Sequence, residues 1–180
     1  MNHSTGTTGI QGVTGPTGPT FAYEGFSAYL SSMAVSSSSQ LTGWSVLPPY
    51  FNSGNFNTTT GNYTVPATGR YLIQATINYS TTAAITIGLG PGIQPAFYVQ
   101  RNSPTTTTLI SGLFPVLNVN VALILVLRSI LGSGTVTLAG EVQLTAGDRI
   151  GLYYAAGGLT LNLNLGGSSG GIVWSVNRIY

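Results

Sequence analysis

Apolar and polar residues alternate with a period of two over much of the chain that follows residue 20. The clearest run is 71–79, where Tyr, Ile and Ala at the odd positions alternate with Leu72, Gln74, Thr76 and Asn78. This period is typical of a β-strand with two unlike faces. No window combines a helical period with capping residues, so the pattern predicts an all-β protein.

Short strands separated by Gly- and Pro-containing turns account for the rest of this pattern. Besides 71–79, strands are predicted at 21–29, 84–89, 97–100, 105–110, 117–127, 136–144, 150–154, 159–165 and 172–179. The Ser-rich segment 31–40 predicts a loop, and 44–51 contains Pro48-Pro49, which favours an edge or a connection over a central strand. Many short strands of this kind predict a sandwich or a barrel.

The run 109–127 contains no charged residue. A membrane-spanning helix needs about 20 consecutive apolar residues, but Pro115, Asn118 and Asn120 interrupt this run. We therefore predict no membrane span. The preferred interpretation is a central strand over 117–127 that is buried on both faces, one in the sandwich core and one at a subunit contact.

Glycine recurs at every third position from Gly6 to Gly18, in the order GTT, GIQ, GVT, GPT and GPT. This is the collagen period, in which only glycine fits at the axis of three wound chains. The alternative is a flexible Gly/Thr linker. Because five triplets are too few to hold a triple helix alone, the rest of the chain is expected to supply a trimeric domain. The predicted organisation is a collagen-like stub over 1–20 and one globular domain over 21–180.

Charge is scarce in this chain, which has three acidic side chains, five arginines, no lysine and no cysteine. Ordinary globular domains carry about 25% charged residues, whereas this chain carries 4%. Such depletion indicates a surface that is buried against copies of itself or made of hydroxyl and amide groups. Scattered arginines do not form the clustered basic face of a nucleic-acid-binding protein. The absence of cysteine excludes disulfides and thiolate metal sites.

Titratable side chains are too few and too scattered for a catalytic centre. The single histidine is His3, in a segment expected to fray, and the acids are Glu24, Glu141 and Asp148. A Ser-His-Asp triad would need His3 to reach the globular domain. A carboxylate pair of the glycosidase type could come only from the three acids. We therefore predict no enzyme activity, no cofactor and no metal site.

Two arginines and the aromatic residues leave binding functions open. Arg149 and Arg178 could bind anionic ligands on an exposed face, or each could pair with a carboxylate or cover an apolar edge with its stem. The second interpretation is preferred, because single arginines are seldom sites. The tyrosines, with Trp44 and Trp174, could line a sugar-binding surface, although alternation favours their use in core or subunit packing.

The stretch 140–154, GEVQLTAGDRIGLYY, places a turn between two alternating runs. In this turn Gly147 supplies a permissive backbone and Asp148 can bond local backbone amides. Both residues are therefore predicted to be structural. A second motif, GRYLI at 69–73, opens a strand directly after a turn that contains Pro and Gly.

Together these two stretches resemble the C1q/TNF-like jelly-roll family, whose signature is G-x-Y-x-[FI] followed by L-x-x-G-D-x-[IVL]-x-L. The resemblance implies a jelly-roll sandwich that assembles as a homotrimer. It also implies a trimer interface that includes Leu72, Gln74 and Val142.

A short collagen-like stub joined directly to such a domain resembles the BclA-like collagen-like glycoproteins of bacterial spore surfaces. That resemblance implies a structural role, in which the domain trimerises the chains and forms the tip of a fibre on the outer spore layer, where other proteins anchor it. It also implies glycan acceptors at Thr8, Thr14, Thr17 and Thr20. The N-terminal anchoring motif of that family is not evident. Two alternatives stay open: an adhesin or lectin-like head that binds a glycan or host receptor, and a phage fibre head.

Overall fold

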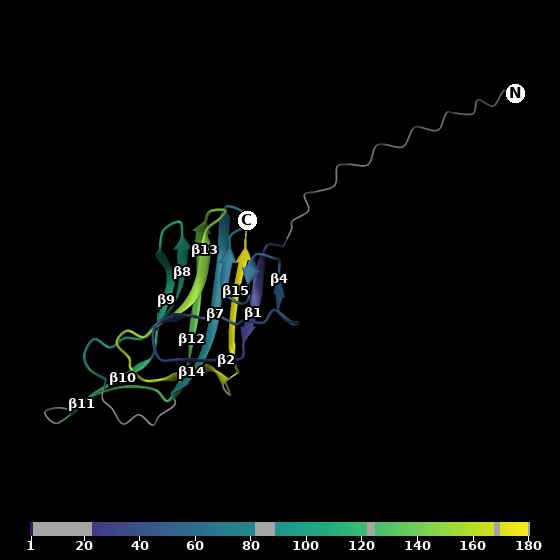
Figure 1. The fold of residues 1–180 in the computed structure, drawn as a ribbon. Coiled ribbons are helices and arrows are strands. Elements are labelled where there is room, and N and C mark those ends of the chain that lie inside the picture. The colour runs from purple at the N-terminus through teal and green to yellow at the C-terminus, as the bar shows by residue number, and fades with distance from the viewer. Residues whose placement is uncertain (2–22, 82–88, 122–124, 168–169, 180) are drawn as a thin grey trace.

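The structure is a computed structural model that describes every residue except 2–22, 82–88, 122–124, 168–169 and 180. The collagen-like stub, its four candidate threonines and His3 lie outside the described residues, as does most of the strand expected at 84–89. Within the described part, the regular elements are antiparallel β-strands, and no α-helix is present. Figure 1 shows these strands stacked in two layers.

The larger layer is a seven-stranded sheet. Its strands are β1 (Gly25–Leu30), β2 (Ser32–Val35), β4 (Phe51–Asn52), β7 (Gly69–Thr81), β12 (Ser133–Leu144), β14 (Leu163–Gly166) and β15 (Ile172–Arg178). The long β7 lies at its centre, because β12 pairs along one side of it while β15 and β14 share the other side. β1 and β4 extend the sheet beyond β15, and β2 extends it beyond β14.

The second layer is a six-stranded sheet, and a separate hairpin extends from the sandwich. The sheet contains β3 (Ser39–Gln40), β5 (Phe56–Asn57), β6 (Asn62–Thr64), β8 (Ala96–Ser103), β9 (Thr107–Leu113) and β13 (Arg149–Ala155), and the hairpin contains β10 (Val116–Val121) and β11 (Leu125–Ile130). The hairpin lies at the end of the sandwich opposite the C-terminus (Figure 1).

The alternation along β7 is the one that the sequence predicts. Tyr71, Ile73 and Ile77 have no exposed surface, whereas Gln74 and Thr76 point to solvent. A strand with this pattern can cover a core with one face only. The predicted strand and its two unlike faces are confirmed.

Aromatic rings from both sheets meet in the core. Phe26 on β1 stacks on Phe56 of β5, with ring centroids 3.9 Å apart. Trp174 on β15 packs edge-on against the same Phe56 at 5.4 Å. Large rings bury much apolar area for little conformational entropy, so they fix how the two sheets pack together.

The prediction of one central strand over 117–127 is wrong. This segment contributes to β10 and β11, which in the described part of the chain form a two-stranded hairpin outside the two sheets of the sandwich. Leu117 retains 47% of its surface exposed. An uncharged apolar run has the same appearance in a buried central strand and in a hairpin, so periodicity could not separate the two.

Two further boundaries differ from the prediction. The Ser-rich segment 31–40 contains β2 and β3, because the edges of β14 and β13 offer unpaired backbone groups to it. Conversely, the run 159–165 is a strand only from Leu163 onward. Leu159 is nevertheless buried, in a turn where its N–H donates to the carbonyl of Ala156, so a buried apolar position does not require a strand.

Candidate functional site

The solvent-facing side of β1, β15, β7 and β12, called here the outer face, holds two of the three residues predicted at a subunit interface. Leu72 and Gln74 both lie on it, because their neighbours in β7 face the core. In the register of the sheet, Gln74 lies between Ala139 of β12 and Ser175 of β15. The structure therefore brings Leu72 and Gln74 onto one broad surface.

Small uncharged side chains dominate the outer face. A shallow groove of about 210 Å³ crosses it, and its lining side chains are Gln74, Thr76, Thr137, Ala139, Val173 and Ser175. Among the described residues of these four strands, the outward-pointing charges are Arg70 and Glu141, which form an ion pair with each other. A copy of the chain could cover such a surface with little cost of charge desolvation.

Val142 lies on the opposite side of the same sheet. Its register partner in β7 is the fully buried Tyr71, and its side chain packs against the core. The structure thus separates Val142 from Leu72 and Gln74. Because the side-chain period of a strand is two, the register between β7 and β12 decides which of their residues share a face, and the sequence alone does not contain that register.

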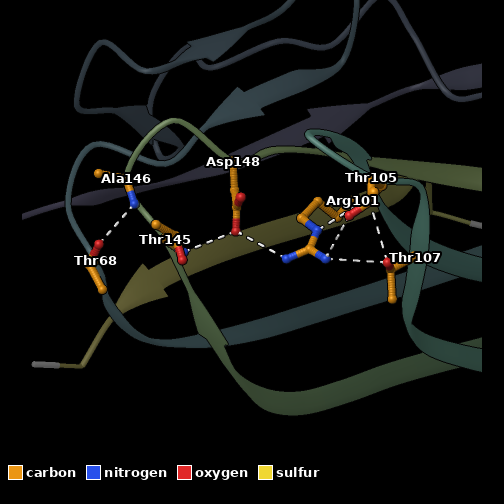
Figure 2. A network of polar contacts seen from close by, with 7 residues as sticks. All are labelled: Thr68, Arg101, Thr105, Thr107, Thr145, Ala146 and Asp148. Carbon is orange, nitrogen blue, oxygen red and sulfur yellow. Dashed lines mark hydrogen bonds and ion pairs between the residues drawn. The ribbon is translucent and has the colours of Figure 1, made fainter.

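The predicted turn connects β12 to β13, and Figure 2 shows its polar contacts. The Asp148 carboxylate accepts a hydrogen bond from the backbone N–H of Thr145 at 2.9 Å. The N–H of Gly147 donates to the carbonyl of Val65, whose own N–H donates to the carbonyl of Asp148, both at 2.8 Å. Gly147 has a φ of 89°, which glycine adopts without strain.

Arg101 completes this turn from the neighbouring strand β8. Its guanidinium lies 3.5 Å from the Asp148 carboxylate and also donates to the hydroxyls of Thr105 and Thr107 (Figure 2). Sequence reasoning did not identify Arg101. The threonine-rich segment beside it was a signal for a polar network, but nothing in the sequence connects Arg101 with an aspartate in a distant turn.

The remaining arginines differ in whether their side chains contact other residues. Arg178 pairs with Glu24 at 3.0 Å and donates to the carbonyl of Thr68, as the preferred interpretation expected. Arg128 donates to two backbone carbonyls of the loop before β8. The guanidinium of Arg149, in contrast, has no ion pair or hydrogen bond with any described residue, so of the two uses in the preferred interpretation, pairing with a carboxylate does not describe it.

The described residues contain no cluster of His, Asp or Glu suited to a metal ion. Each of the three acids instead lies beside an arginine, in three different parts of the fold. No helix among the residues described is long and apolar enough to cross a membrane. The predictions of no catalysis and no cofactor stay predictions.

No protein-family model and no curated protein sequence matches the chain. Among solved structures, Eiger TNF from S. frugiperda is similar with a TM-score of 0.55 and 15% identity, over 88% of this chain and 93% of that one. Murine APRIL, crystallised at pH 5.0, is similar with a TM-score of 0.58 and 14% identity, over 88% of this chain and 100% of that one. These likenesses show the fold, and the predicted all-β jelly roll of the TNF type is confirmed.

Proposed function

We propose that the domain is the self-associating head of a collagen-like fibre, and that three copies pack through the outer face. The observation that carries the proposal is the composition of this face. Leu72 and Val173 are half-buried among Gln, Ser, Thr and Ala side chains. The two charged side chains described on this face, Arg70 and Glu141, form an ion pair with each other. Apolar and small neutral groups on a pleated surface associate by burial of area without unpaired charges.

The outward side of the second sheet is a poorer surface for self-association. It carries the exposed guanidinium of Arg149 and a row of amide side chains. Burial of this arginine against another copy would require an acceptor, and all three side-chain carboxylates of the chain already lie beside other arginines. The outer face of the larger sheet is therefore the better candidate.

The number three has independent support in the sequence. The collagen period from Gly6 to Gly18 is useful only when three chains wind together. A trimeric head would hold three such segments close together and raise their effective concentration. The resemblance to C1q/TNF-like jelly rolls implies the same number of subunits.

The location that we propose is an outer surface, in the manner of the BclA-like glycoproteins, with the stub directed toward the anchor and with glycans on Thr8, Thr14, Thr17 and Thr20. The support is the resemblance of the stub and head in combination. Labelling of intact spores and cells with an antibody to the folded domain tests this proposal. Surface label that protease removes is expected, whereas label found only after lysis would contradict it.

The mass of the full chain in solution tests the self-association. Multi-angle light scattering at micromolar concentration should give three times the 18.6 kDa of one chain. A monodisperse species of 18.6 kDa would contradict the proposal. Truncation of residues 1–20 should leave the mass ratio at three, because the proposed contacts lie in the folded domain.

A further inference from the structure

One arginine of the chain has no intramolecular partner in the described structure. Arg70, Arg101 and Arg178 each lie beside a carboxylate, and Arg128 donates to carbonyl oxygens. Arg149 has none of these contacts among the described residues and is exposed. All three acidic side chains of the chain pair with other arginines, so no side-chain carboxylate pairs with Arg149.

Arg149 lines a pocket on the second sheet. The pocket has a volume of about 560 Å³ and is lined by Gly54, Asn55, Phe56, Asn57, Thr60, Asn62, Thr64 and Arg149. Most of these residues offer an amide or a hydroxyl group. A hollow of this size that combines neutral donors and acceptors with a single cation has the chemistry of a ligand site.

Hydrogen bonds hold the walls of this pocket in place. The Asn52 carboxamide accepts from the N–H groups of Gly54 and Phe56 and donates to the Phe56 carbonyl at 2.8 Å. The N–H of Thr64 donates to the carbonyl of Asn55 at 2.9 Å. A ligand would therefore meet a wall that is already ordered, which lowers the entropic cost of binding.

The side chain of Asn62 has an amino group left over for a ligand. Its Oδ1 accepts from Gln40 Nε2 at 2.9 Å and from Asn102 Nδ2 at 3.3 Å. The orientation of Gln40 follows from its other contacts, because its Nε2 also donates to the carbonyl of Gly61 and its Oε1 accepts from the hydroxyl of Tyr153. No described residue accepts from Asn62 Nδ2, so this group can donate to a bound molecule.

We propose that this pocket binds an acidic saccharide. The carboxylate of a sugar acid would accept a bidentate pair of hydrogen bonds from the guanidinium of Arg149. The ring hydroxyls would exchange hydrogen bonds with the Asn and Thr side chains, which are both donors and acceptors. Thr64 is the register partner of Arg149 on the adjacent strand β6, so one hydroxyl and the guanidinium lie side by side at the pocket.

Other ligand classes fit this pocket less well. A nucleic acid or a polyphosphate would need several cations, and the pocket lining has one. An apolar ligand would leave the amides unpaired. The site does not depend on the proposed trimer, because Arg149 and Thr64 lie on the outward side of the second sheet and the outer face belongs to the first.

Titration of the full chain with glucuronic acid and with N-acetylneuraminic acid, followed by amide chemical shifts, tests the proposal. At least one of the two acids should bind saturably, while glucose and inorganic sulfate should each bind about tenfold more weakly. Arg149→Gln should weaken binding of the acid about tenfold or more. The control Arg70→Gln has the same net charge and leaves the pocket intact, so it should retain the affinity of the wild type.

A second variant examines the sugar part of the ligand. Thr64→Val keeps the shape and strand preference of the side chain but removes its hydroxyl, so it should weaken binding of the acid several-fold and leave sulfate binding unchanged. Three results would overturn the proposal: neither acid binds saturably, sulfate binds as tightly as the acids, or Arg149→Gln binds like the wild type. Melting temperatures of all variants, read in the same samples, establish that each remains folded.

Discussion

The guanidinium of Arg101 lies 3.5 Å from the carboxylate of Asp148 and joins strand β8 to the turn between β12 and β13. Asp148 is 3% exposed, and its second contact is the hydrogen bond from the Thr145 backbone. A buried carboxylate needs such partners, because removal of its hydration is otherwise costly. The pair thus explains how a buried charged residue can be part of this turn.

Substitution of Asp148 should separate its hydrogen-bonding role from its charge. Asp148→Leu removes the acceptor for the Thr145 N–H and leaves Arg101 without its carboxylate, so we expect it to lower the free energy of unfolding by about 1–3 kcal/mol. Asp148→Asn keeps an acceptor and should lose less. Urea denaturation of both variants at neutral pH measures the difference.

A calcium ion would give a different result for the same pair of variants. If Asp148 held calcium, calcium would stabilise the wild type and the Asp148→Asn variant would lose that stabilisation. If Asp148 is structural, the wild type has the same melting temperature with calcium and with a chelator. We expect no difference between these two conditions in the wild type. A large shift would contradict the structural role.

A charge at Leu72 should disrupt the proposed trimer. The residue lies at the proposed contact on the outer face, and Leu72→Asp would bring one unpaired carboxylate from each copy into that contact, which costs several kcal/mol. Light scattering should show the mass falling toward the 18.6 kDa of a single chain. Circular dichroism should show that the β-structure of the domain persists.

Leu113→Asp is the matched control for this experiment. Leu113 belongs to β9 in the second sheet and is 61% exposed, so the same substitution there adds the same charge away from the outer face. This variant should keep the mass of the wild type. Equal dissociation of both variants would argue against the outer face as the contact.

Val142 and Leu72 should respond differently to truncation. Val142→Ala removes two methyl groups that pack on the core, and we expect a loss of about 1 kcal/mol in the free energy of unfolding of the domain. Leu72→Ala should weaken assembly with a smaller effect on the isolated fold. Denaturation of the monomeric Leu72→Asp variant, compared with the double variant that also carries Val142→Ala, measures the loss in free energy of unfolding caused by Val142→Ala. If Val142→Ala weakened assembly and left the free energy of unfolding unchanged, the result would support the interface role that the family resemblance implies for Val142.

The sequence predicted much of this fold because its strands are short and their faces are unlike. The alternation in 71–79 and the turn at Gly147 and Asp148 are local properties, and local patterns are present in the sequence itself. The hairpin of β10 and β11 was missed for the opposite reason: an apolar run has the same appearance whether it is one central strand of a sheet or the two strands of a hairpin.

The candidate sites depended more on contacts between distant segments. The period of 71–79 put Leu72 on the face opposite Tyr71, as the structure has it, and the family resemblance grouped Val142 with Leu72 although the register of β12 on β7 puts Val142 opposite buried Tyr71. The pocket beside Arg149 combines residues of the segment 54–64 with the start of β13. No pattern within either segment predicts that the other lies next to it.

Alkaline pH should reveal the burial of Tyr154. Its ring packs against those of Phe97 and Phe114, its hydroxyl has no hydrogen-bond partner among the described residues, and burial raises its pKa to about 12. In the unfolded chain a tyrosine loses its proton near pH 10. The folded state therefore holds this proton more tightly, so the stability it contributes is full below pH 10 and is lost as the pH rises from about 10 to about 12.

Tyr154→Phe should remove this pH dependence without harm at neutral pH. The variant lacks both the ionisable group and a buried hydroxyl without a partner, so at pH 7 its free energy of unfolding should equal or exceed that of the wild type. Between pH 7 and 11.5 the wild type should lose about 2 kcal/mol more than the variant. Urea denaturation at pH 7 and at pH 11.5 measures the loss, and phenolate absorbance should show one group fewer titrating near pH 12. An identical loss in both proteins would mean that the Tyr154 hydroxyl reaches solvent in the folded state.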